Sequence, residues 1–335
     1  MRVGLLGAGR IGAFHASTLA ATSRVESLTL WDPRADVARV IAERVGGRVA
    51  ESPSALLGDR LDALLICSPS TTHEDILAEA VHKGIPTFCE KPVATTLDAT
   101  ARLRTLVEST DVPVTIGFQR RSDPGYRALR QRVVSGELGK LYLARMISAD
   151  EAPPPAEYLA SSGGLFTDQS VHDFDIVRYI TGAEIVSVYA TGAALTGAAG
   201  FAETADIDTA VTVLTLSSGT MVSLTSSRHS AAGYDVTFEL AGSSSVATVS
   251  MATRRPAADG VADVVASDGG FLATFADAYR AEVGYFLDFI EGIGDNPCSM
   301  RDAYIAFSVA QAADHSRRSG IPVRIDQHTL DGILR

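Results

Sequence analysis

The chain has 335 residues, of which 46% are hydrophobic and 21% are charged, and its net charge is −11. This length exceeds what one compact core usually holds, so we expect two domains. The acidic balance argues against nucleic acid and anionic membranes as partners, since both attract basic patches. Strand-like residues begin at once where a signal peptide would stand, and we find no apolar run of the roughly 18–20 residues that span a bilayer.

The chain contains three cysteines, Cys67, Cys89 and Cys298, which are odd in number and lack the spacing of metal ligands. Thiols of this kind are typical of a reducing compartment. We therefore predict a cytoplasmic protein without a structural metal.

A glycine-rich turn follows the first apolar run of the chain. The order of strand, Gly-x-Gly-x-x-Gly and helix is the fingerprint of dinucleotide binding. Gly7 allows the tight turn, Gly9 lets the pyrophosphate approach the backbone, and Gly12 lets helix and strand pack closely. Arg10 and Ile11 stand where the helix offers its N–H groups to the phosphates, so we include both among the cofactor contacts.

Asp32 ends the second apolar run, twenty positions after Gly12. An acidic residue at this place binds the adenosine ribose hydroxyls and repels the extra phosphate of NADP, so the sequence predicts NAD. Arg34 keeps NADP open as an alternative, because a nearby guanidinium accepts a 2′-phosphate. A solvated residue at a helix start is the simpler explanation of Arg34.

Short apolar runs alternate with helical segments, which predicts an α/β Rossmann domain with a doubly wound parallel sheet over residues 1–121. In such sheets ligands bind beyond the carboxyl ends of the strands. The polar residues expected at the cofactor fall at or just after those ends: Ser68, Pro69, His73, Glu90, Lys91 and Gln119.

Strands dominate the second predicted domain, residues 122–335. Thr209 to Leu216 and Thr220 to Ser226 flank a Ser-Ser-Gly turn and should pair as a hairpin, and Asp235 to Leu240 should pair with Ser245 to Met251. We predict an α+β domain whose large, mostly antiparallel sheet carries helices on one face. The other face is apolar enough to bury against a second subunit, so we expect a homo-oligomer.

A polar motif follows Gly163 and Gly164 in this domain. Asp168 and His172 are four positions apart and Asp175 is three further on, so the three side chains share one face of a helix. Two carboxylates and an imidazole are an unusual combination for a purely structural helix. We therefore predict that this face carries chemistry.

Four motifs together resemble the glucose-fructose oxidoreductase/inositol dehydrogenase/MocA family over nearly the whole chain: Gly-x-Gly-x-x-Gly, Ser-Pro-x-x-x-His from Ser68, Glu-Lys-Pro from Glu90, and Gly-Gly…Asp-x-x-x-His. The resemblance is closest to inositol 2-dehydrogenases. It implies an NAD(P)-dependent dehydrogenase that acts on a CH–OH group of a cyclic polyol or sugar. It also implies a cis peptide bond before Pro92, a catalytic Lys91, and assembly through the second sheet into dimers or homotetramers.

The resemblance extends to the substrate site. Gly-Tyr-Asp around Tyr234 matches the inositol dehydrogenases and implies that this tyrosine lines the site. Ser148 departs from the pattern, because many inositol dehydrogenases carry a histidine there, and the acidic Asp150 and Glu151 follow it. The expected substrate contacts are Lys91, Gln119, Arg120, Asp150, Asp168, Gln169, His172 and Tyr234.

Alcohol oxidation needs a hydride acceptor and a base for the hydroxyl proton. Histidine suits the second role because its ordinary pKa, about 6.5, lies near working pH. We expect His172 to be the base and Asp168 to orient it, while Lys91 stabilises the substrate oxygen or joins the proton relay. The sequence leaves open which of His172 and Lys91 removes the proton.

Three alternatives remain beside the oxidation of myo-inositol or a related cyclitol. Asp168, His172 and Asp175 could hold a metal ion, but the nucleotide fingerprint would then have no purpose. The chain could be an NAD-binding sensor without turnover. Finally, Asp150 and Glu151 would favour a cationic amino sugar or aminocyclitol over a neutral sugar or polyol.

Overall fold

A computed structural model of the chain describes residues 1–256, 262–265 and 269–325. The chain divides into two compact units, which we describe separately. Unit 1 contains Met1–Ser122 and Asp277–Tyr304, and unit 2 contains Asp123–Ala276 and Ile305–Arg335. The first boundary lies one residue from the predicted one, whereas the return of 277–304 to unit 1 differs from the predicted division.

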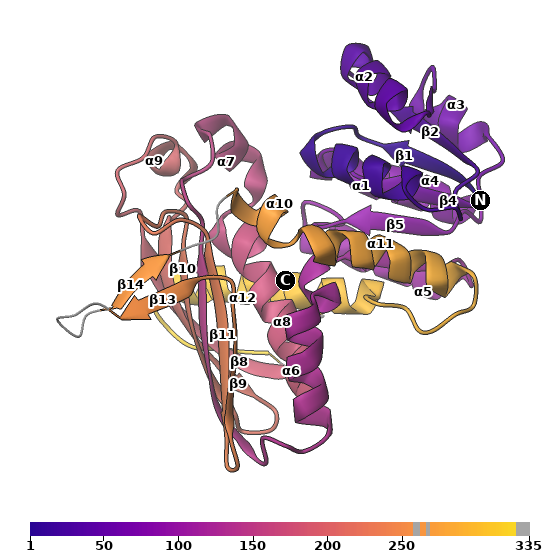
Figure 1. Cartoon of the computed structure of the whole chain (residues 1–335). Helices are drawn as coiled ribbons and strands as arrows, with labels where there is room; N and C mark the ends of the chain where they lie inside the picture. Colours follow the sequence, from indigo (N-terminus) through magenta and orange to yellow (C-terminus); the bar gives the residue numbers. More distant parts are fainter. Residues whose placement is uncertain (257–261, 266–268, 326–335) are drawn as a thin grey trace. The chain divides into compact units, whose positions relative to one another are not determined.

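Unit 1 is built on a six-stranded parallel sheet with the strand order β3-β2-β1-β4-β5-β6. This is the predicted doubly wound arrangement, with helices between successive strands (Figure 1). Its strands are β1 (Arg2–Leu6), β2 (Ser27–Trp31), β3 (Arg48–Val49), β4 (Ala63–Ile66), β5 (Thr87–Glu90) and β6 (Val114–Gly117). Its helices are α1 (Arg10–Ala20), α2 (Ala35–Val45), α3 (Pro53–Gly58), α4 (His73–His82), α5 (Leu97–Glu108) and the short η1 (Ser70–Thr72) and η2 (Gln119–Ser122).

Helix α11 (Ala276–Ile290) explains why the later segment belongs to unit 1. Val283, Phe286 and Leu287 are buried in the same hydrophobic core as the central strands of the parallel sheet. Arg24 holds the outer side of this helix through an ion pair with Asp288, at 2.8 Å. The periodicity of the helix shows which of its faces is apolar, but not which domain that face packs against, so the sequence assigned it to its neighbours in the chain.

Unit 2 is built on a seven-stranded sheet with the order β12-β11-β7-β10-β9-β8-β15. Its strands are β7 (Leu141–Ala149), β8 (Ile185–Ala193), β9 (Thr209–Leu216), β10 (Met221–Ser227), β11 (Asp235–Gly242), β12 (Val246–Ser250) and β15 (Val323–Arg324), and β13 (Thr253–Pro256) pairs separately with β14 (Ala262–Val265). Its helices are α6 (Pro124–Val134), α7 (Ala156–Ser162), η3 (Phe166–Ser170), α8 (Val171–Thr181), α9 (Phe201–Thr204), α10 (Gly270–Thr274) and most of α12 (Met300–Ser319).

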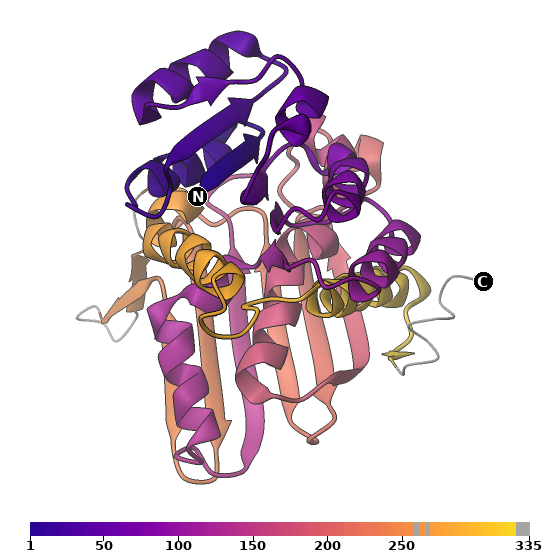
Figure 2. The same ribbon diagram turned by 90° about the vertical axis from the view of Figure 1, so that its right-hand side faces the viewer.

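The predicted mostly antiparallel sheet is confirmed. Strands β9 and β10 form a hairpin, as do β11 and β12, while β7 and β10 are the one parallel pair in this sheet. Gly219 closes the first hairpin with a φ of +84°, a conformation that suits glycine. Residues along β9 alternate between buried and more exposed positions, so the sheet has one inner face. Helices α6 and α8 lie across that face (Figure 2).

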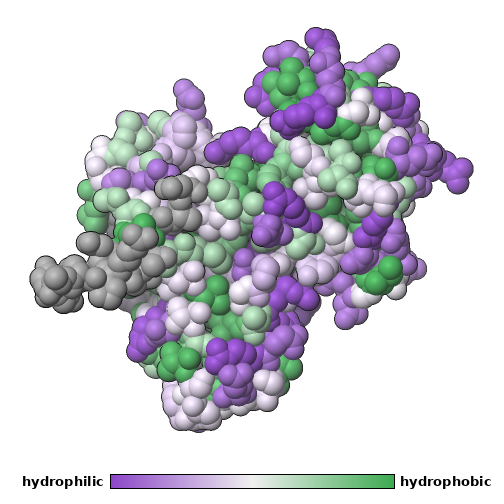
Figure 3. Space-filling model, viewed as in Figure 1, coloured by the Kyte–Doolittle hydropathy of each residue, from purple (hydrophilic) through white to green (hydrophobic). Residues whose placement is uncertain are grey.

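The surface of each unit mixes polar and apolar residues. Hydrophilic groups and small apolar patches alternate over the face shown in Figure 3. Within the described part of the chain, every helix is too short or too polar to cross a membrane.

Candidate functional site

The glycine turn of unit 1 has the geometry that a dinucleotide requires. Gly7 has a φ of +96°, and a Cβ on Gly12 would overlap the carbonyl oxygen of Gly7, so neither position tolerates a side chain. By contrast, a Cβ on Gly9 would have no neighbour within 4 Å. Helix α1 begins directly after Gly9 and its N-terminal cap has no side-chain hydrogen bond. The turn therefore offers an open backbone and helix N–H groups to a pyrophosphate, which fits NAD.

Asp32 lies at the carboxyl end of β2, beside this turn. Its Oδ2 accepts a hydrogen bond from the N–H of Ala8 at 2.8 Å. Its Oδ1 accepts from the backbone N–H of Arg34 at 3.0 Å and from the guanidinium Nε of the same residue at 3.1 Å. Burial raises the pKa of Asp32, but these hydrogen bonds outweigh it and lower the pKa overall, so the carboxylate stays ionised. The Arg34 guanidinium is thus bound to the predicted ribose ligand.

His73 braces the ends of two neighbouring strands. Its ring is buried. Nε2 lies 2.7 Å from the carbonyl oxygen of Ser68, and Nδ1 lies 2.8 Å from the carbonyl oxygen of Pro92. Burial lowers the pKa of His73, although both carbonyls favour its protonated form. The ring nitrogens are engaged with the backbone, so any effect of His73 on a cofactor is indirect. The Lys91–Pro92 peptide bond is cis, as the resemblance implies, and Lys91 is half-buried.

Glu90 points into unit 1. Its Oε1 lies 2.8 Å from His15 Nε2, and Glu282 from α11 reaches within 3.9 Å of the same nitrogen. Burial and the charge of Glu90 raise the pKa of Glu282 well above its ordinary value. In the described ranges these three residues are the one group with metal-ligating atoms within 4.8 Å of one another. The cluster anchors the end of β5 from which Lys91 departs.

Gln119 and Arg120 lie in η2, directly after the last strand of the parallel sheet, and both are buried. Their neighbour Arg121 forms an ion pair with Asp302, with NH2 3.2 Å from Oδ1. Arg121 also donates to the carbonyl of Pro297 at 3.2 Å. This segment is therefore rigidly attached to the rest of unit 1. Ser68 and Pro69 lie between β4 and η1, also at the carboxyl edge of the sheet.

The polar motif of unit 2 is not a uniform α-helix. Phe166–Ser170 forms a π-helical turn, η3, and α8 begins at Val171. Asp168 therefore lies in the π-helical turn and His172 in the first turn of the α-helix, and both side chains are half-buried. Asp175 is only 1% exposed. Asp168 and His172 therefore belong to two different helical segments, their shared face stays a prediction, and Asp175 faces the interior. π-turns of this kind are frequent at functional sites.

Both oxygens of Asp168 have defined partners in unit 2. Oδ1 accepts from the Tyr158 hydroxyl at 2.8 Å, and Oδ2 accepts from NH1 of the buried Arg228 at 2.9 Å. Tyr158 and Arg228 are site residues that our sequence reasoning missed. Arg228 lies in a Ser-Arg-His segment that is conspicuous in the sequence, but nothing in its spacing relates it to Asp168, sixty positions earlier.

The remaining predicted substrate residues of unit 2 lie near the ends of strands. The Ser148 hydroxyl donates to Asp173 Oδ1 at 2.8 Å, so the place of the expected histidine faces α8. Asp150 follows β7 and is half-buried. Gln169 uses its amide nitrogen to donate to the carbonyl of Ser227 at 3.0 Å. Tyr234 is buried and packs edge-on against Phe275, with ring centres 6.3 Å apart.

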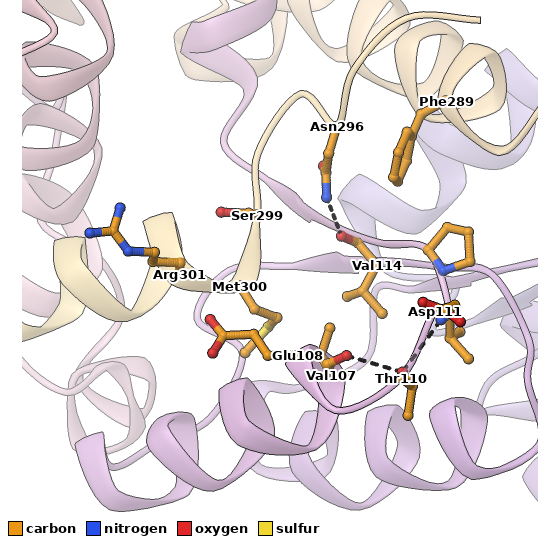
Figure 4. Close-up of a pocket in the computed structure, with 12 residues that line it drawn as sticks. Val107, Glu108, Thr110, Asp111, Val114, Phe289, Asn296, Ser299, Met300 and Arg301 are labelled. Carbon is orange, nitrogen blue, oxygen red and sulfur yellow. Dashed lines mark hydrogen bonds between the residues drawn. The ribbon is translucent and has the colours of Figure 1, made fainter. Parts of the chain in front are cut away.

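Two cavities of unit 1 lie away from most of these residues. One of about 350 Å³ lies between the end of α5, the start of β6 and the segment before α12, and Asn296 closes one side by donating to the Val114 carbonyl (Figure 4). It is at the amino end of β6, opposite to Gln119. The other, of about 390 Å³, runs along α1 and brings Arg10 beside Arg44 and Arg280.

The chain matches known proteins along most of its length. Residues 1–118 match an oxidoreductase family with an NAD-binding Rossmann fold, and residues 126–248 match the GFO/IDH/MocA C-terminal domain. A myo-inositol dehydrogenase of Streptomyces leeuwenhoekii is 38% identical over 96% of this chain and 99% of its own length.

Solved structures agree with these matches. A myo-inositol dehydrogenase from Corynebacterium glutamicum has a TM-score of 0.89 and 34% identity, covering 97% of this chain and 99% of its own. A scyllo-inositol dehydrogenase from Lactobacillus casei, solved with NAD(H) and scyllo-inositol, has a TM-score of 0.86 and 26% identity, covering 97% and 98%. The chain therefore belongs to the GFO/IDH/MocA family of NAD-binding oxidoreductases.

Proposed function

We propose that this protein oxidises a secondary alcohol of a cyclic polyol to the ketone with NAD, and that myo-inositol or a related cyclitol is the substrate. The observation that carries this proposal is the coverage of the relatives: proteins named as inositol dehydrogenases match both units from end to end. The open Gly9 backbone and the ionised Asp32 support NAD as the cofactor. The reduced Cys67, Cys89 and Cys298 fit the predicted cytoplasmic setting.

The residues of unit 1 would bind NAD, which accepts a hydride when bound. Asp32 takes the adenosine ribose hydroxyls, and the start of α1 takes the pyrophosphate. Because Arg34 is bound to the Asp32 carboxylate, we propose that it favours NAD by holding that carboxylate in place. The other proposed contacts are Gly7, Arg10, Ile11, Gly12, Ser68, Pro69, Glu90, Lys91 and Gln119.

Proton transfer falls to Lys91, Asp168 and His172. The substrate hydroxyl donates its proton to His172, whose imidazole Asp168 orients from the preceding turn. The Lys91 ammonium hydrogen-bonds the same substrate oxygen and stabilises the negative charge that develops on it. The remaining hydroxyl groups of the ring are bound by polar side chains, for which we propose Gln119, Arg120, Asp150, Gln169 and Tyr234.

A specific observation favours a second substrate class, an amino sugar or aminocyclitol. Ser148 replaces an imidazole that many inositol dehydrogenases have and is bound to Asp173 instead. This region contains three carboxylates, Asp150, Asp168 and Asp206, and one buried arginine, Arg228, so its negative charges outnumber this positive charge. An excess of negative charge would attract a protonated amine on the substrate.

The outer face of the seven-stranded sheet supports the proposed homo-oligomer. Large apolar side chains of β8, β9 and β10 remain exposed there: Tyr189, its cross-strand partner Val213, Val211 and Met221. An ion pair between Arg145 and Glu239 lies on the same face. Replacing Val213 by Glu should give a smaller particle in analytical ultracentrifugation than the wild-type protein. A wild-type protein that sediments as a monomer would contradict the proposal.

A substrate panel followed by NADH absorbance tests the proposed reaction. The panel contains myo-inositol, scyllo-inositol, neutral hexoses, amino sugars and aminocyclitols, each with NAD and with NADP. We expect the highest kcat/KM for a cyclitol with NAD, and a preference for the amino compounds would select the second class. Tight NAD binding without reduction by any compound would instead identify a sensor.

A further inference from the structure

Arg228 follows β10 and is the largest fully buried side chain of the described chain, with 1% of its surface exposed. Its backbone N–H donates to the Asp208 carbonyl at 2.7 Å, which fixes where the side chain enters the unit. Its NH1 lies 2.9 Å from Asp168 Oδ2, and its NH2 lies 3.7 Å from Asp206 Oδ2. Burying a guanidinium destabilises the fold unless carboxylates compensate its charge, so Arg228, Asp168 and Asp206 form one ion-pair network.

Asp206 connects the arginine to the start of the motif. Its Oδ1 accepts from the N–H of Leu165 at 3.0 Å. Gly164 has a φ of +89°, and a Cβ there would lie 3.0 Å from the same Asp206 oxygen, so the turn is closed tightly against this carboxylate. The chain of contacts from Leu165 through Asp206 and Arg228 to Asp168 therefore links the residue before the π-helical turn to the middle of that turn.

Tyr158 completes the environment of Asp168 from α7. Its hydroxyl donates to Oδ1, whereas Arg228 NH1 donates to Oδ2. Burial, together with the charge of Asp168, raises the pKa of Tyr158, so the hydroxyl keeps its proton over the range in which enzymes work. Because Tyr158 and Arg228 donate to different oxygens, residues outside the motif constrain the plane of the Asp168 carboxylate.

We propose that Arg228 is a positioning residue for the dehydrogenase reaction: it keeps Asp168 ionised, fixes its orientation and moderates its pull on His172. This inference rests on the roles of Asp168 and His172 in the proposed function. A carboxylate beside an imidazole stabilises the imidazolium, and a cation beside that carboxylate offsets part of this effect. Arg228 thereby keeps His172 neutral, and able to accept a proton, at a lower pH than Asp168 alone would allow.

The other charges of this region determine the sign of the effect. Tyr158 stays neutral, Asp150 and Asp206 add negative charge, and Asp173 and Asp175 lie on the buried side of α8. Arg228 brings a positive charge to 2.9 Å from the Asp168 carboxylate. Removing it leaves His172 among carboxylates, so the proton affinity of His172 should rise. Removing the Asp206 charge instead should lower it.

The test measures the pKa of His172 by NMR titration of the histidine ring protons, with His172→Gln used to assign the signal. In Arg228→Gln we expect this pKa to rise by about one unit, because the loss of the guanidinium leaves the Asp168 charge uncompensated. Arg228→Lys keeps the charge and should stay near the wild-type value. Asp206→Asn should shift the pKa downward.

Arg178→Gln is the matched control. Arg178 is also buried and forms a bidentate pair with Glu184, at 2.6 and 2.9 Å, at the other end of α8. Its loss should lower stability without moving the His172 titration. The acid limb of the kcat–pH profile should shift with the His172 pKa measured by NMR, so Arg228→Gln should regain activity at higher pH. A purely structural defect would instead lower activity by the same factor at every pH.

The outcomes separate this inference from the proposed function. An unchanged His172 pKa in Arg228→Gln, or an equal shift in Arg178→Gln, overturns the role of Arg228 whether or not the enzyme turns over cyclitols. If Arg228→Gln does not fold, the sign of the Asp206→Asn shift decides, and an upward shift contradicts the proposal. A wild-type protein that reduces no NAD with any polyol refutes the function, while the titration still reports on Arg228.

Discussion

The two units hold their proposed site residues in different ways. In unit 1 the backbone does most of the positioning: glycine φ angles shape the phosphate turn, and Asp32 and Lys91 directly follow the carboxyl ends of β2 and β5. In unit 2 side chains do it, because Asp168 is held by Tyr158 and Arg228. Backbone positioning leaves a short signature in the sequence, whereas a side-chain network recruits residues that are far apart in the chain.

The largest effect should come from the proposed base in unit 2. We expect His172→Ala to lower kcat by about 100- to 10,000-fold, the range of general acid–base catalysis, because the variant lacks the imidazole that accepts the proton. NAD affinity, measured by fluorescence titration, should remain near the wild-type value, since the nucleotide turn belongs to unit 1. Equal losses of kcat and NAD affinity would contradict the separate tasks of the units.

A pair of glycine substitutions tests the backbone positioning in unit 1. Gly9→Ala should leave the thermal midpoint nearly unchanged, because the added methyl meets no protein atom within 4 Å. It should weaken NAD binding by about tenfold or more, as the methyl stands where the pyrophosphate approaches. Gly12→Ala is the contrasting variant: its methyl overlaps the Gly7 carbonyl, so overpacking should cost about 1–3 kcal/mol of stability in urea unfolding. A stability loss in Gly9→Ala as large as that in Gly12→Ala would argue against an open turn.

Cofactor choice should respond to Asp32. In Asp32→Ala the repulsion of a 2′-phosphate is removed and Arg34 is released from its ion pair, so the ratio of kcat/KM for NAD over NADP should fall by about tenfold. Arg34→Ala is the control. This variant keeps the Asp32 carboxylate and loses the guanidinium, so its kcat/KM with NADP should fall. An unchanged ratio in Asp32→Ala would exclude this carboxylate as the determinant.

The smallest effect concerns the Arg121–Asp302 pair, where unit 1 also uses side chains. Burial raises the pKa of Asp302, but the Arg121 guanidinium and Ser299 lower it more, to about 2 from 3.8. Because the folded pKa lies below the unfolded one, this stabilisation is complete above pH 3.8 and is lost as the pH falls through about 2. Asp302→Asn should therefore reduce the free energy of unfolding by about 1–2 kcal/mol at pH 7.

Urea unfolding at several pH values measures this difference. The gap between wild type and Asp302→Asn should shrink as the pH is lowered through the acid range, because the wild-type carboxylate then takes up its proton. A gap that stays constant with pH would show that packing, and not charge, accounts for the loss. Asp302→Asn does not change the nucleotide turn, so either result reports on side-chain interactions in unit 1 and not on its backbone positioning.

Much of the architecture could be predicted because its causes are local. The alternation of apolar runs and helices gave the parallel sheet, and turn residues such as Gly219 marked the hairpins of the second sheet. The assignment of α11 could not be predicted in this way. Val283 and Phe286 have the spacing of a buried helical face, but the partner of such a face is chosen by the packing of distant segments.

The same division applies to the candidate site. The sequence by itself determined the nucleotide turn and the place of Asp32 at the end of β2, because both depend on short spacings in the chain. The pairing of Asp168 with His172 stays a prediction from the same kind of spacing. Only the tertiary structure decided that Asp175 is buried, that Phe166–Ser170 forms a π-turn, and that Arg228 and Asp206 hold Asp168. Contacts between residues about twenty to sixty positions apart have no period in the sequence, since they exist only after the sheet has brought strand ends and helix starts together.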